Sequence, residues 1–266
     1  MKAIEISEFG VAKLAIVERP DPQPGPGQVL VRVRAVSLNF RDLMTVQGQY
    51  NPRQKLPLIP LSDGAGEVVA VGAGVRRFKP GDRVAAIFAQ KWLGGEATPA
   101  ARGSTLGGPG DGMAAELVAL DEDGLLAIPE HLSFEQAATL PCAGVTAWNA
   151  VVVQGQVKPG DTVLALGTGG VSLFALQFAK AAGARVIITS SSDEKLARAK
   201  ALGADHGVNY ATDPDWDKAV LALTDKAGVD QVVEVGGAGT IGKSINVARL
   251  GGTITIIGVL AGNATE

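Results

Sequence analysis

The stretch of residues 162–172, TVLALGTGGVS, constrains the fold of this chain more than any other part of the sequence. Its first five residues suit a strand that is buried between two layers of helices. The glycines that follow allow a turn too tight for side chains, in which backbone N–H groups can approach an anion. Apolar residues then recur at helical spacing from about Val171 to Ala182, and Gly183 ends the predicted helix.

Strand, glycine turn and helix in this order are typical of the start of a dinucleotide-binding unit, with the pyrophosphate at the helix N-terminus. A second apolar strand, residues 185–189, follows at the interval that a βαβ unit requires. Ser172 stands where the third glycine of the G-x-G-x-x-G pattern should be. The alternative is a tight turn in a doubly wound domain that binds no nucleotide.

Composition excludes several classes of protein. The chain has 266 residues, enough for two domains, and a net charge of −3, which gives no electrostatic case for a nucleic-acid surface. A single cysteine excludes internal disulfides and indicates a reducing compartment. The N-terminus has no apolar core of signal length, and no apolar run is long enough to span a membrane. We therefore expect a cytoplasmic protein without nucleic-acid or membrane partners.

The first part of the chain, to about residue 128, is predicted to be β-rich. Valines alternate with other residues over 29–34, as in a half-buried strand. Residues 64–87 predict two short strands around a turn at Pro80, Gly81 and Asp82. A small, closed or strongly bent sheet is expected.

The second part is predicted to be α/β. Residues 133–154 should be helical and broken near Pro141, with Ser133 and Gln136 as a capping box. The domain boundary is placed just before this segment, which gives domains of residues 1–131 and 132–266. Strands that alternate with helices then predict a parallel sheet. These strands are residues 162–166, 185–189, 207–210, 231–235 and 253–257.

Four segments resemble the medium-chain dehydrogenase/reductase family, and in particular its zinc-independent, quinone-oxidoreductase-like branch. They are PGPGQVLVRVRAVSLNFRDL (24–43), PLSDGAGEVVAVGAGVRRFKPGDRV (60–84), AATLPCAGVTAW (137–148) and GDTVLALGTGGVSLFALQFAKAAGARVI (160–187). The resemblance implies a GroES-like β-barrel catalytic domain and a doubly wound Rossmann domain. It also implies a cleft between them for NADP(H) and substrate.

The residues at the zinc-ligand positions of this family favour a site without metal. Zinc-dependent relatives have Cys at position 39 and His-Glu at 62 and 63, whereas this chain has Asn39, Ser62 and Asp63. Only Cys142 matches a ligand position, and a catalytic zinc needs three protein ligands. Cys142 alone is better explained as a small buried residue. The alternative is a zinc-type alcohol dehydrogenase that recruits Asp63 and Cys142 with a third ligand.

The sequence ends soon after the predicted strand 253–257, where the family continues with a sixth strand and a return to the catalytic domain. The Rossmann domain is therefore expected to lack its last strand, with strand 253–257 at an edge. An uncovered apolar edge favours association. A family-like homodimer is expected for a full-length chain.

The residues after the second Rossmann strand determine whether the protein prefers NADH or NADPH. An acidic residue there would accept hydrogen bonds from the ribose and repel a 2′-phosphate, but Ser190 and Ser191 are small hydroxyls. By resemblance to NADPH-binding quinone reductases, these serines, Lys195 and Tyr210 hold the 2′-phosphate. NADPH is the predicted cofactor. The alternative makes Asp193 the ribose ligand, but its position favours a role at the helix N-terminus.

The resemblance also implies further cofactor contacts. Thr146 matches a residue near the nicotinamide and phosphates. The remaining predicted contacts are backbone groups of the glycine turn and of later strand ends. They are Gly167, Gly169, Gly170 and Val171 in the turn, and Gly236, Gly258 and Val259 at the strand ends. The strand-end glycines are equally explained as ordinary turn residues.

Hydride transfer from C4 of NADPH to a quinone, enone or related carbonyl acceptor is the expected reaction, because hydrogen-bond donors can stabilise the charge on a conjugated oxygen. Asn39 is the candidate donor; its alternative is to cap local backbone. Tyr50, Phe88 and Trp92 are candidates for an apolar acceptor pocket, although aromatic residues of a β domain often belong to the core. A further hypothesis is an NADPH-binding protein without catalytic activity.

Overall fold

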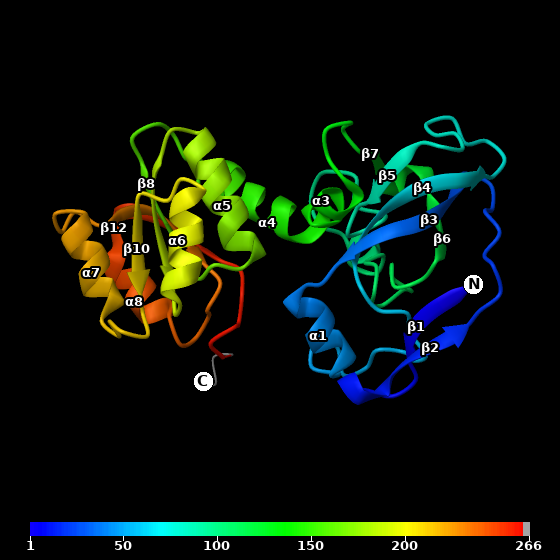
Figure 1. Ribbon diagram of the computed structural model, residues 1–266, viewed down its shortest axis with the longest axis horizontal. Coiled ribbons are helices and arrows are strands. Elements are labelled where there is room, and N and C mark those ends of the chain that lie inside the picture. The colour runs from blue at the N-terminus through cyan, green and yellow to red at the C-terminus, as the bar shows by residue number, and fades with distance from the viewer. Residues whose placement is uncertain (263–266) are drawn as a thin grey trace. The chain divides into compact units, whose positions relative to one another are not determined.

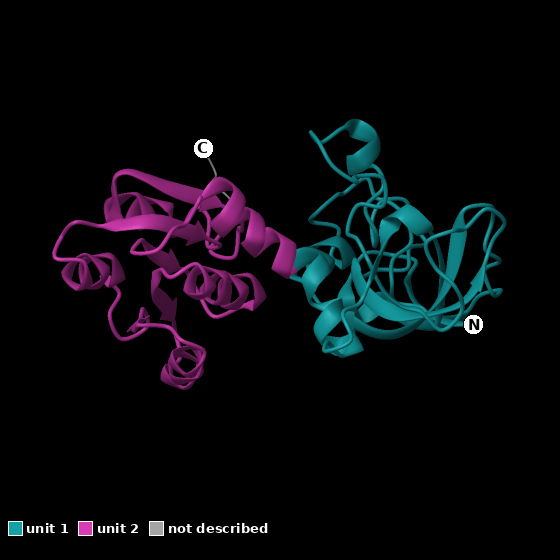
Figure 2. Cartoon of the chain, turned by 90° about the horizontal axis from the view of Figure 1, so that it is seen from above, with its two compact units in different colours: residues 1–142 teal, residues 143–266 magenta. Residues whose placement is uncertain are grey.

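The computed structural model describes residues 1–262. The chain forms two compact units, residues 1–142 and 143–266, which Figure 2 shows in different colours. The sequence placed the boundary at 131/132, ahead of the helical segment. Helix α3 (Phe134–Ala138) instead lies in the first unit, because Ala137 and Ala138 are buried there with Ala65 and Ile128.

The first unit is β-rich, as predicted. It contains a five-stranded antiparallel sheet in the order β6-β3-β4-β5-β7 and a separate pair of antiparallel strands, β1 and β2. Its core is mostly valine and leucine from the larger sheet, including Val29, Val68 and Leu125. The strands are β1 (Lys2–Ile6), β2 (Leu14–Glu18), β3 (Gln28–Ser37), β4 (Asp63–Val71), β5 (Arg83–Ala86), β6 (Leu117–Asp121) and β7 (Leu125–Ala127). The α-helices other than α3 are α1 (Phe40–Val46) and α2 (Pro99–Arg102).

The second unit is built on a parallel sheet in the order β10-β9-β8-β11-β12, which confirms the predicted parallel sheet. Figure 1 labels β8, β10 and β12 of this sheet. The strands are β8 (Thr162–Ala165), β9 (Arg185–Ser190), β10 (His206–Asn209), β11 (Val229–Glu234) and β12 (Ala248–Ile256). The helices are α4 (Val145–Trp148), α5 (Gly170–Ala181), α6 (Asp193–Ala201), α7 (Trp216–Leu223) and α8 (Ile241–Val247). One core cluster contains side chains of α5 and α6, and a second contains those of α7 and α8.

The centre of this sheet is strand β8, and helix α5 follows it directly. All four residues of β8 are buried, which a strand covered on both faces requires. The buried residues of α5 are Ser172, Ala175, Leu176 and Ala179, a stripe at helical spacing. Burial of a leucine such as Leu176 contributes roughly 1.5–3 kcal/mol. This packing fixes the turn between β8 and α5.

The segment predicted as a helix broken near Pro141 is a succession of short helical turns. Ser133 and Gln136 form the expected capping box at the start of α3, with hydrogen bonds of 3.2 and 2.9 Å between side chains and backbone. A π-helical turn (Leu140–Gly144) follows, then α4, then a second π-helical turn (Asn149–Gln154). Proline lacks the N–H that a continuous α-helix would need at position 141.

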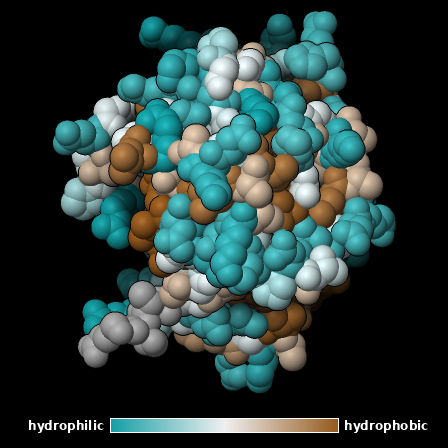
Figure 3. Space-filling model, turned by 90° about the vertical axis from the view of Figure 1, so that its left-hand side faces the viewer, coloured by the Kyte–Doolittle hydropathy of each residue, from teal (hydrophilic) through white to brown (hydrophobic). Residues whose placement is uncertain are grey.

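Strand β12 lies at the edge of the parallel sheet, as predicted, and within residues 1–262 it pairs with β11 alone. Leu250 on this strand is 98% exposed. Figure 3 shows the molecule from the side on which α7 is drawn in Figure 1, and this surface is mainly hydrophilic with apolar residues between the polar ones. No helix within residues 1–262 combines the length and apolar character needed to cross a membrane.

Candidate functional site

The glycine turn of the second unit is bordered by open space. Gly167 has φ of +72°, and its N–H donates a 3.0 Å hydrogen bond to Thr189 Oγ1 at the end of β9. Gly169 is the N-cap of α5, and Gly170 and Val171 are its first residues. A Cβ atom added at Gly167 or Gly169 would meet no atom of residues 1–262 within 4 Å. The turn therefore has room for a phosphate at the start of a 12-residue helix.

Ser172 replaces the third glycine of the usual pattern without opening the turn. Ser172 is 1% exposed, and its hydroxyl donates a 2.6 Å hydrogen bond to the carbonyl oxygen of Leu166. The side chain thereby joins the first turn of α5 to the residue that precedes Gly167. The departure from G-x-G-x-x-G is thus compatible with a tight strand-to-helix turn.

Hydroxyl groups gather at the carboxyl ends of β9 and β10, where the two strands end as neighbours. Ser190 is the last residue of β9 and is 3% exposed, whereas Ser191 and Lys195 are exposed. Tyr210 follows β10, has a largely exposed side chain and donates its N–H to the carbonyl oxygen of Ser190 at 3.0 Å. These four residues come to one edge of the sheet.

Asp193, the alternative ribose ligand, has another partner. Its carboxylate accepts a 2.7 Å hydrogen bond from Asn209 Nδ2, and it is the first residue of α6. Ser192 caps the same helix by accepting a hydrogen bond of 3.3 Å from the N–H of Lys195. The acidic side chain thus joins α6 to β10. A carboxylate in the first turn also suits the helix dipole.

The buried carboxylate of Glu234 organises the chain that follows β11, including the predicted contact Gly236. This group accepts hydrogen bonds from the N–H groups of Gly236 (2.7 Å) and Gly237 (3.0 Å). The hydroxyls of Thr240 (2.6 Å) and Ser244 donate to it as well. A Cβ at Gly236 would overlap the Thr240 side chain.

At Gly258 a Cβ would overlap the Val235 carbonyl. Close packing within the chain therefore explains glycine at both 236 and 258. Val259 follows Gly258 and is partly exposed. Thr146 lies in α4 and is half-buried. A cofactor contact at each of these four positions stays a prediction.

In the first unit, the residues at the family's zinc-ligand positions form one buried polar network. Asn39 precedes α1, and its N–H donates a 2.9 Å hydrogen bond to Asp42 Oδ2. Asp42 Oδ1 accepts the N–H of Ser62 at 3.2 Å, and the Ser62 hydroxyl donates to Asp63 Oδ1 at 2.8 Å. Asp63 Oδ2 accepts the N–H of Cys142 at 2.9 Å. Asn39 Nδ2 is buried and has no hydrogen-bond acceptor within the described residues.

Burial sets the protonation behaviour of this network. It raises the pKa of both Asp42 and Asp63, against the effect of their hydrogen bonds. Burial, together with the charges of Asp63 and Asp42, raises the pKa of the Cys142 thiol to about 12. A catalytic zinc takes three protein ligands of Cys, His or carboxylate type, whereas the zinc-ligand positions offer only Cys142 and Asp63 beside Asn39 and Ser62. This donor set does not fit a catalytic zinc. Over residues 1–262, no three His, Cys, Asp or Glu side chains are placed to hold a metal.

Two of the three aromatic residues predicted to line an acceptor pocket pack on one arginine. The Arg41 guanidinium lies 5.0 Å from the ring centre of Tyr50 and 4.8 Å from that of Phe88. Arg41 is buried and donates hydrogen bonds to the carbonyl oxygens of Leu106 and Gly108. Trp92 donates its Nε1–H to the carbonyl oxygen of Gly95 at 3.0 Å.

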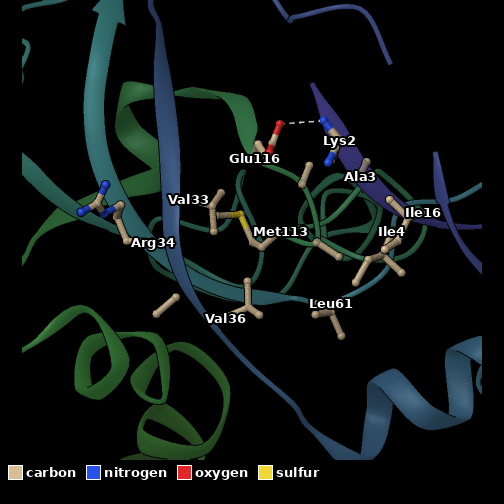
Figure 4. A pocket seen from close by; sticks show the side chains of 13 residues that line it. Lys2, Ala3, Ile4, Ile16, Val33, Arg34, Val36, Leu61, Met113 and Glu116 are labelled. Carbon is tan, nitrogen blue, oxygen red and sulfur yellow. Dashed lines mark hydrogen bonds between the residues drawn. The ribbon is translucent and has the colours of Figure 1, made fainter. Parts of the chain in front are cut away.

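The first unit has two apolar pockets whose linings include none of these aromatic residues. One has a volume of about 350 Å³ and lies among β1, β2, β3 and Met113. Figure 4 shows its apolar side chains and, among the lining residues, the hydrogen bond of 2.7 Å from the Lys2 N–H to Glu116. The second, of about 420 Å³, has Asn39 and Asp42 as the only polar residues in its lining. Its other lining residues are Ile4, Val11, Leu14, Leu38, Phe40, Leu43, Val46, Pro60, Leu61 and Ala114.

Sequence reasoning missed the apolar neighbours of Asn39. Leu38 and Phe40, on either side of Asn39, and Leu43 one turn later, are exposed apolar residues that line the second pocket. Exposed apolar residues that flank a polar candidate would have been a usable signal.

Comparison with known proteins agrees with this architecture. Residues 25–130 match the family model described as alcohol dehydrogenase GroES-like domain, and residues 170–266 match the one described as zinc-binding dehydrogenase. A zinc-type alcohol dehydrogenase-like protein of Schizosaccharomyces pombe is 48% identical over 98% of this chain and 76% of its own length.

Two solved structures have the same fold over nearly the whole chain. A quinone oxidoreductase of Pseudomonas syringae is 36% identical, with a TM-score of 0.84 over 99% of this chain and 75% of its own. An NAD-dependent alcohol dehydrogenase is 40% identical, with a TM-score of 0.90 over 99% of this chain and 78% of its own. The GroES-like and Rossmann domains predicted from the sequence are thereby confirmed. The chain is an oxidoreductase that belongs to the medium-chain dehydrogenase/reductase family.

Proposed function

We propose that this chain is an NADPH-dependent oxidoreductase that transfers a hydride to a quinone, enone or related carbonyl acceptor without a metal. The observation that carries the cofactor assignment is the set of groups at the ends of β9 and β10. Hydroxyls, an exposed lysine and an exposed tyrosine gather there, while Asp193 is bonded to Asn209. A 2′-phosphate is attracted by the lysine and accepts hydrogen bonds from the hydroxyls.

The glycine turn supplies the second half of the cofactor site. The N–H groups of Gly169, Gly170 and Val171 are at the N-terminus of α5, where the helix dipole favours an anion. The pyrophosphate would lie in the open space beside Gly167 and Gly169. A bound nicotinamide supplies the hydride from its C4 atom. The protein binds the cofactor, orients it towards the acceptor and provides the electrostatic environment of the transfer.

On the acceptor side, Asn39 is the proposed hydrogen-bond donor. Its Nδ2 is buried and has no acceptor within residues 1–262, and an unpaired buried donor costs about 1–3 kcal/mol, which a ligand oxygen would recover. Asn39 also lines the larger apolar pocket, which has the size and character of a small-molecule site. As negative charge develops on the acceptor oxygen, a fixed amide donor stabilises it. Tyr50, Phe88 and Trp92 remain proposed contacts for the acceptor.

The test is a parallel titration of the protein with NADPH and NADH, followed by fluorescence, with a small enone and a quinone then added. We expect tighter binding of NADPH and its oxidation when an acceptor is added. Lys195→Glu should remove the preference for NADPH, because it reverses the charge beside the 2′-phosphate. Lys200→Glu is the matched control, since Lys200 is an exposed residue in the last turn of the same helix.

Three outcomes would contradict the proposal in different ways. Equal affinity for the two cofactors, or a preference for NADH as in an NAD-dependent alcohol dehydrogenase, would overturn the cofactor assignment. NADPH binding without oxidation by any enone or quinone would favour a non-catalytic binding protein. Stoichiometric zinc in the purified protein, with oxidation of an alcohol, would favour the zinc-type enzyme.

A further inference from the structure

We infer that Thr168 is a specificity-determining residue whose hydroxyl donates a hydrogen bond to the 2′-phosphate of the cofactor. The inference rests on the proposed use of NADPH and adds a residue to the site that binds it. Within the glycine turn, Thr168 forms a side-chain hydrogen bond to Ser190, the last residue of the neighbouring strand β9. Its Oγ1 lies 3.1 Å from the Oγ of Ser190.

The position of Thr168 is fixed by its surroundings. Gly167, immediately before it, donates its N–H to Thr189 Oγ1 at 3.0 Å, and Ser190 follows Thr189 on β9. Two successive turn residues are thus joined to two successive strand residues. The Thr168 hydroxyl is therefore placed at the boundary between the pyrophosphate turn and the proposed 2′-phosphate site.

The directions of the hydrogen bonds follow from the number of donors and acceptors. A hydroxyl has one hydrogen to donate and two lone pairs that accept. Ser190 Oγ already accepts the N–H of Ser192 at 3.3 Å. The two hydroxyls carry two hydrogens, and the bond between them uses one. The other hydrogen, on whichever residue accepts that bond, is left to find an acceptor elsewhere.

Burial decides which hydrogen that is. Ser190 is 3% exposed, whereas Thr168 is partly exposed. The free hydrogen can reach a ligand from Thr168, with the chain of hydrogen bonds running from the Ser192 N–H through Ser190 to Thr168. In this arrangement Ser190 acts on the 2′-phosphate through Thr168 and does not donate to it directly. Each bond in such a chain polarises the next, so the last hydroxyl is a strengthened donor.

A strengthened donor discriminates between the two cofactors. The 2′-phosphate of NADPH is anionic and offers only acceptor oxygens near neutral pH, and hydrogen bonds to charged groups are stronger than neutral ones. The ribose hydroxyl of NADH is neutral and can bond to water equally well. The Thr168 hydroxyl should therefore contribute to the binding of NADPH and little to that of NADH.

The experiment measures the dissociation constants of 2′,5′-ADP and 5′-AMP by calorimetry, with no turnover involved. These two ligands differ only in the 2′-phosphate. Thr168→Val removes the hydroxyl at nearly constant shape, and we expect it to weaken 2′,5′-ADP about tenfold while 5′-AMP changes less than about twofold. Thr168→Ser keeps the hydroxyl and should bind both ligands as the parent chain does.

Thr224→Val is the matched control. The Thr224 hydroxyl donates to carbonyl oxygens at the end of α7. Thr224 precedes β11 and therefore lies at the amino ends of the strands, whereas the proposed 2′-phosphate site lies at their carboxyl ends. It should leave the ratio of the two dissociation constants unchanged. Thr168→Ala provides a second removal of the hydroxyl, and thermal unfolding identifies any variant that does not fold.

The outcomes separate the inference from the proposed function. If the parent chain prefers 2′,5′-ADP and Lys195→Glu abolishes this preference, but Thr168→Val and Thr168→Ala retain it, the role of Thr168 alone is wrong. Equal weakening of both ligands by Thr168→Val would place the hydroxyl at the 5′-phosphate and also overturn the inference. If the parent chain has no preference for 2′,5′-ADP, the proposed use of NADPH fails first.

Discussion

The hydroxyl of Ser172 donates a 2.6 Å hydrogen bond to the carbonyl oxygen of Leu166, across the glycine turn between β8 and α5. Because both residues are buried, Ser172→Ala should leave this carbonyl without its donor and lower the free energy of unfolding by about 1–3 kcal/mol. Ser172→Gly restores the usual third glycine but should be less stable still, by up to about 1 kcal/mol, since glycine is unfavourable in a helix. Urea unfolding measures both. A glycine variant as stable as the parent chain would show that the serine only fills space.

Gly169→Ala separates folding from cofactor binding. Gly169 has φ of −80°, which alanine adopts readily, and an added Cβ would meet nothing within 4 Å. We expect an unchanged melting temperature and at least about tenfold weaker NADPH binding, because the methyl group would occupy the space proposed for the pyrophosphate.

Gly242→Ala is the control for that variant. Gly242 lies in α8, and its added Cβ would also meet nothing within 4 Å. The change should raise the free energy of unfolding by about 0.5–1 kcal/mol and leave cofactor binding unaltered. Normal NADPH affinity in Gly169→Ala would contradict the proposed pyrophosphate position.

Arg41 should not be replaceable by lysine. Its planar guanidinium lies against Tyr50 and Phe88 while it donates to two carbonyl oxygens, and an ammonium group cannot reproduce both. We expect Arg41→Lys to lower the free energy of unfolding by about 2–3 kcal/mol, measured by urea unfolding. Arg53→Lys, at an exposed position, should change it by less than about 0.5 kcal/mol. Equal stability of the two variants would show that the arrangement around Arg41 contributes little.

The buried carboxyl of Asp63 makes stability depend on pH in a definite direction. Burial raises its pKa above the ordinary value of 3.8, so the folded protein binds this proton more tightly than the unfolded chain. The contribution of the protonated Asp63 carboxyl to stability is complete below pH 3.8 and is lost as the pH rises through the raised pKa. Asp63→Asn removes this titration, and the stability of the parent chain relative to the variant should fall as the pH rises above 3.8. Urea unfolding at several pH values checks it; a difference that is constant or rises with pH would contradict the assignment.

The thiol of Cys142 should be unusually slow to react. Its pKa of about 12, against an ordinary 9.0, leaves about a thousandfold less thiolate at neutral pH. Since it is the single cysteine, alkylation by iodoacetamide can be followed without ambiguity. We expect labelling at pH 8 to be at least about tenfold slower in the folded protein than in urea, because the greater nucleophilicity of a more basic thiolate offsets part of the smaller thiolate fraction. Comparable rates would show that the sulfur is accessible and ionised.

The sequence was sufficient for the order of the parallel strands, because one glycine turn and the spacing of apolar segments define a doubly wound sheet. The capping box at Ser133 was equally readable, since both of its partners lie within one helical turn. Local signals of this kind depend only on neighbouring residues.

The polar network of the first unit could not be predicted in the same way. It joins Asp63 to Cys142, which are far apart in the sequence, and its geometry depends on how α1 and β4 pack. The placement of Tyr50 and Phe88 on Arg41 was missed for the same reason, as was the contact between Thr168 and Ser190. Side-chain partners of this kind are set by tertiary packing, which a pattern of residue types does not encode.

The central position of β8 has a consequence for the rigidity of the glycine turn. The strand is paired with β9 on one side and β11 on the other, so its amide hydrogens should exchange with solvent only when the second unit unfolds as a whole. The turn begins at the end of this central strand and is held by hydrogen bonds to Ser172 and Thr189 on either side of it. A ligand that binds there meets a preformed surface, and little of its affinity is spent on ordering the chain.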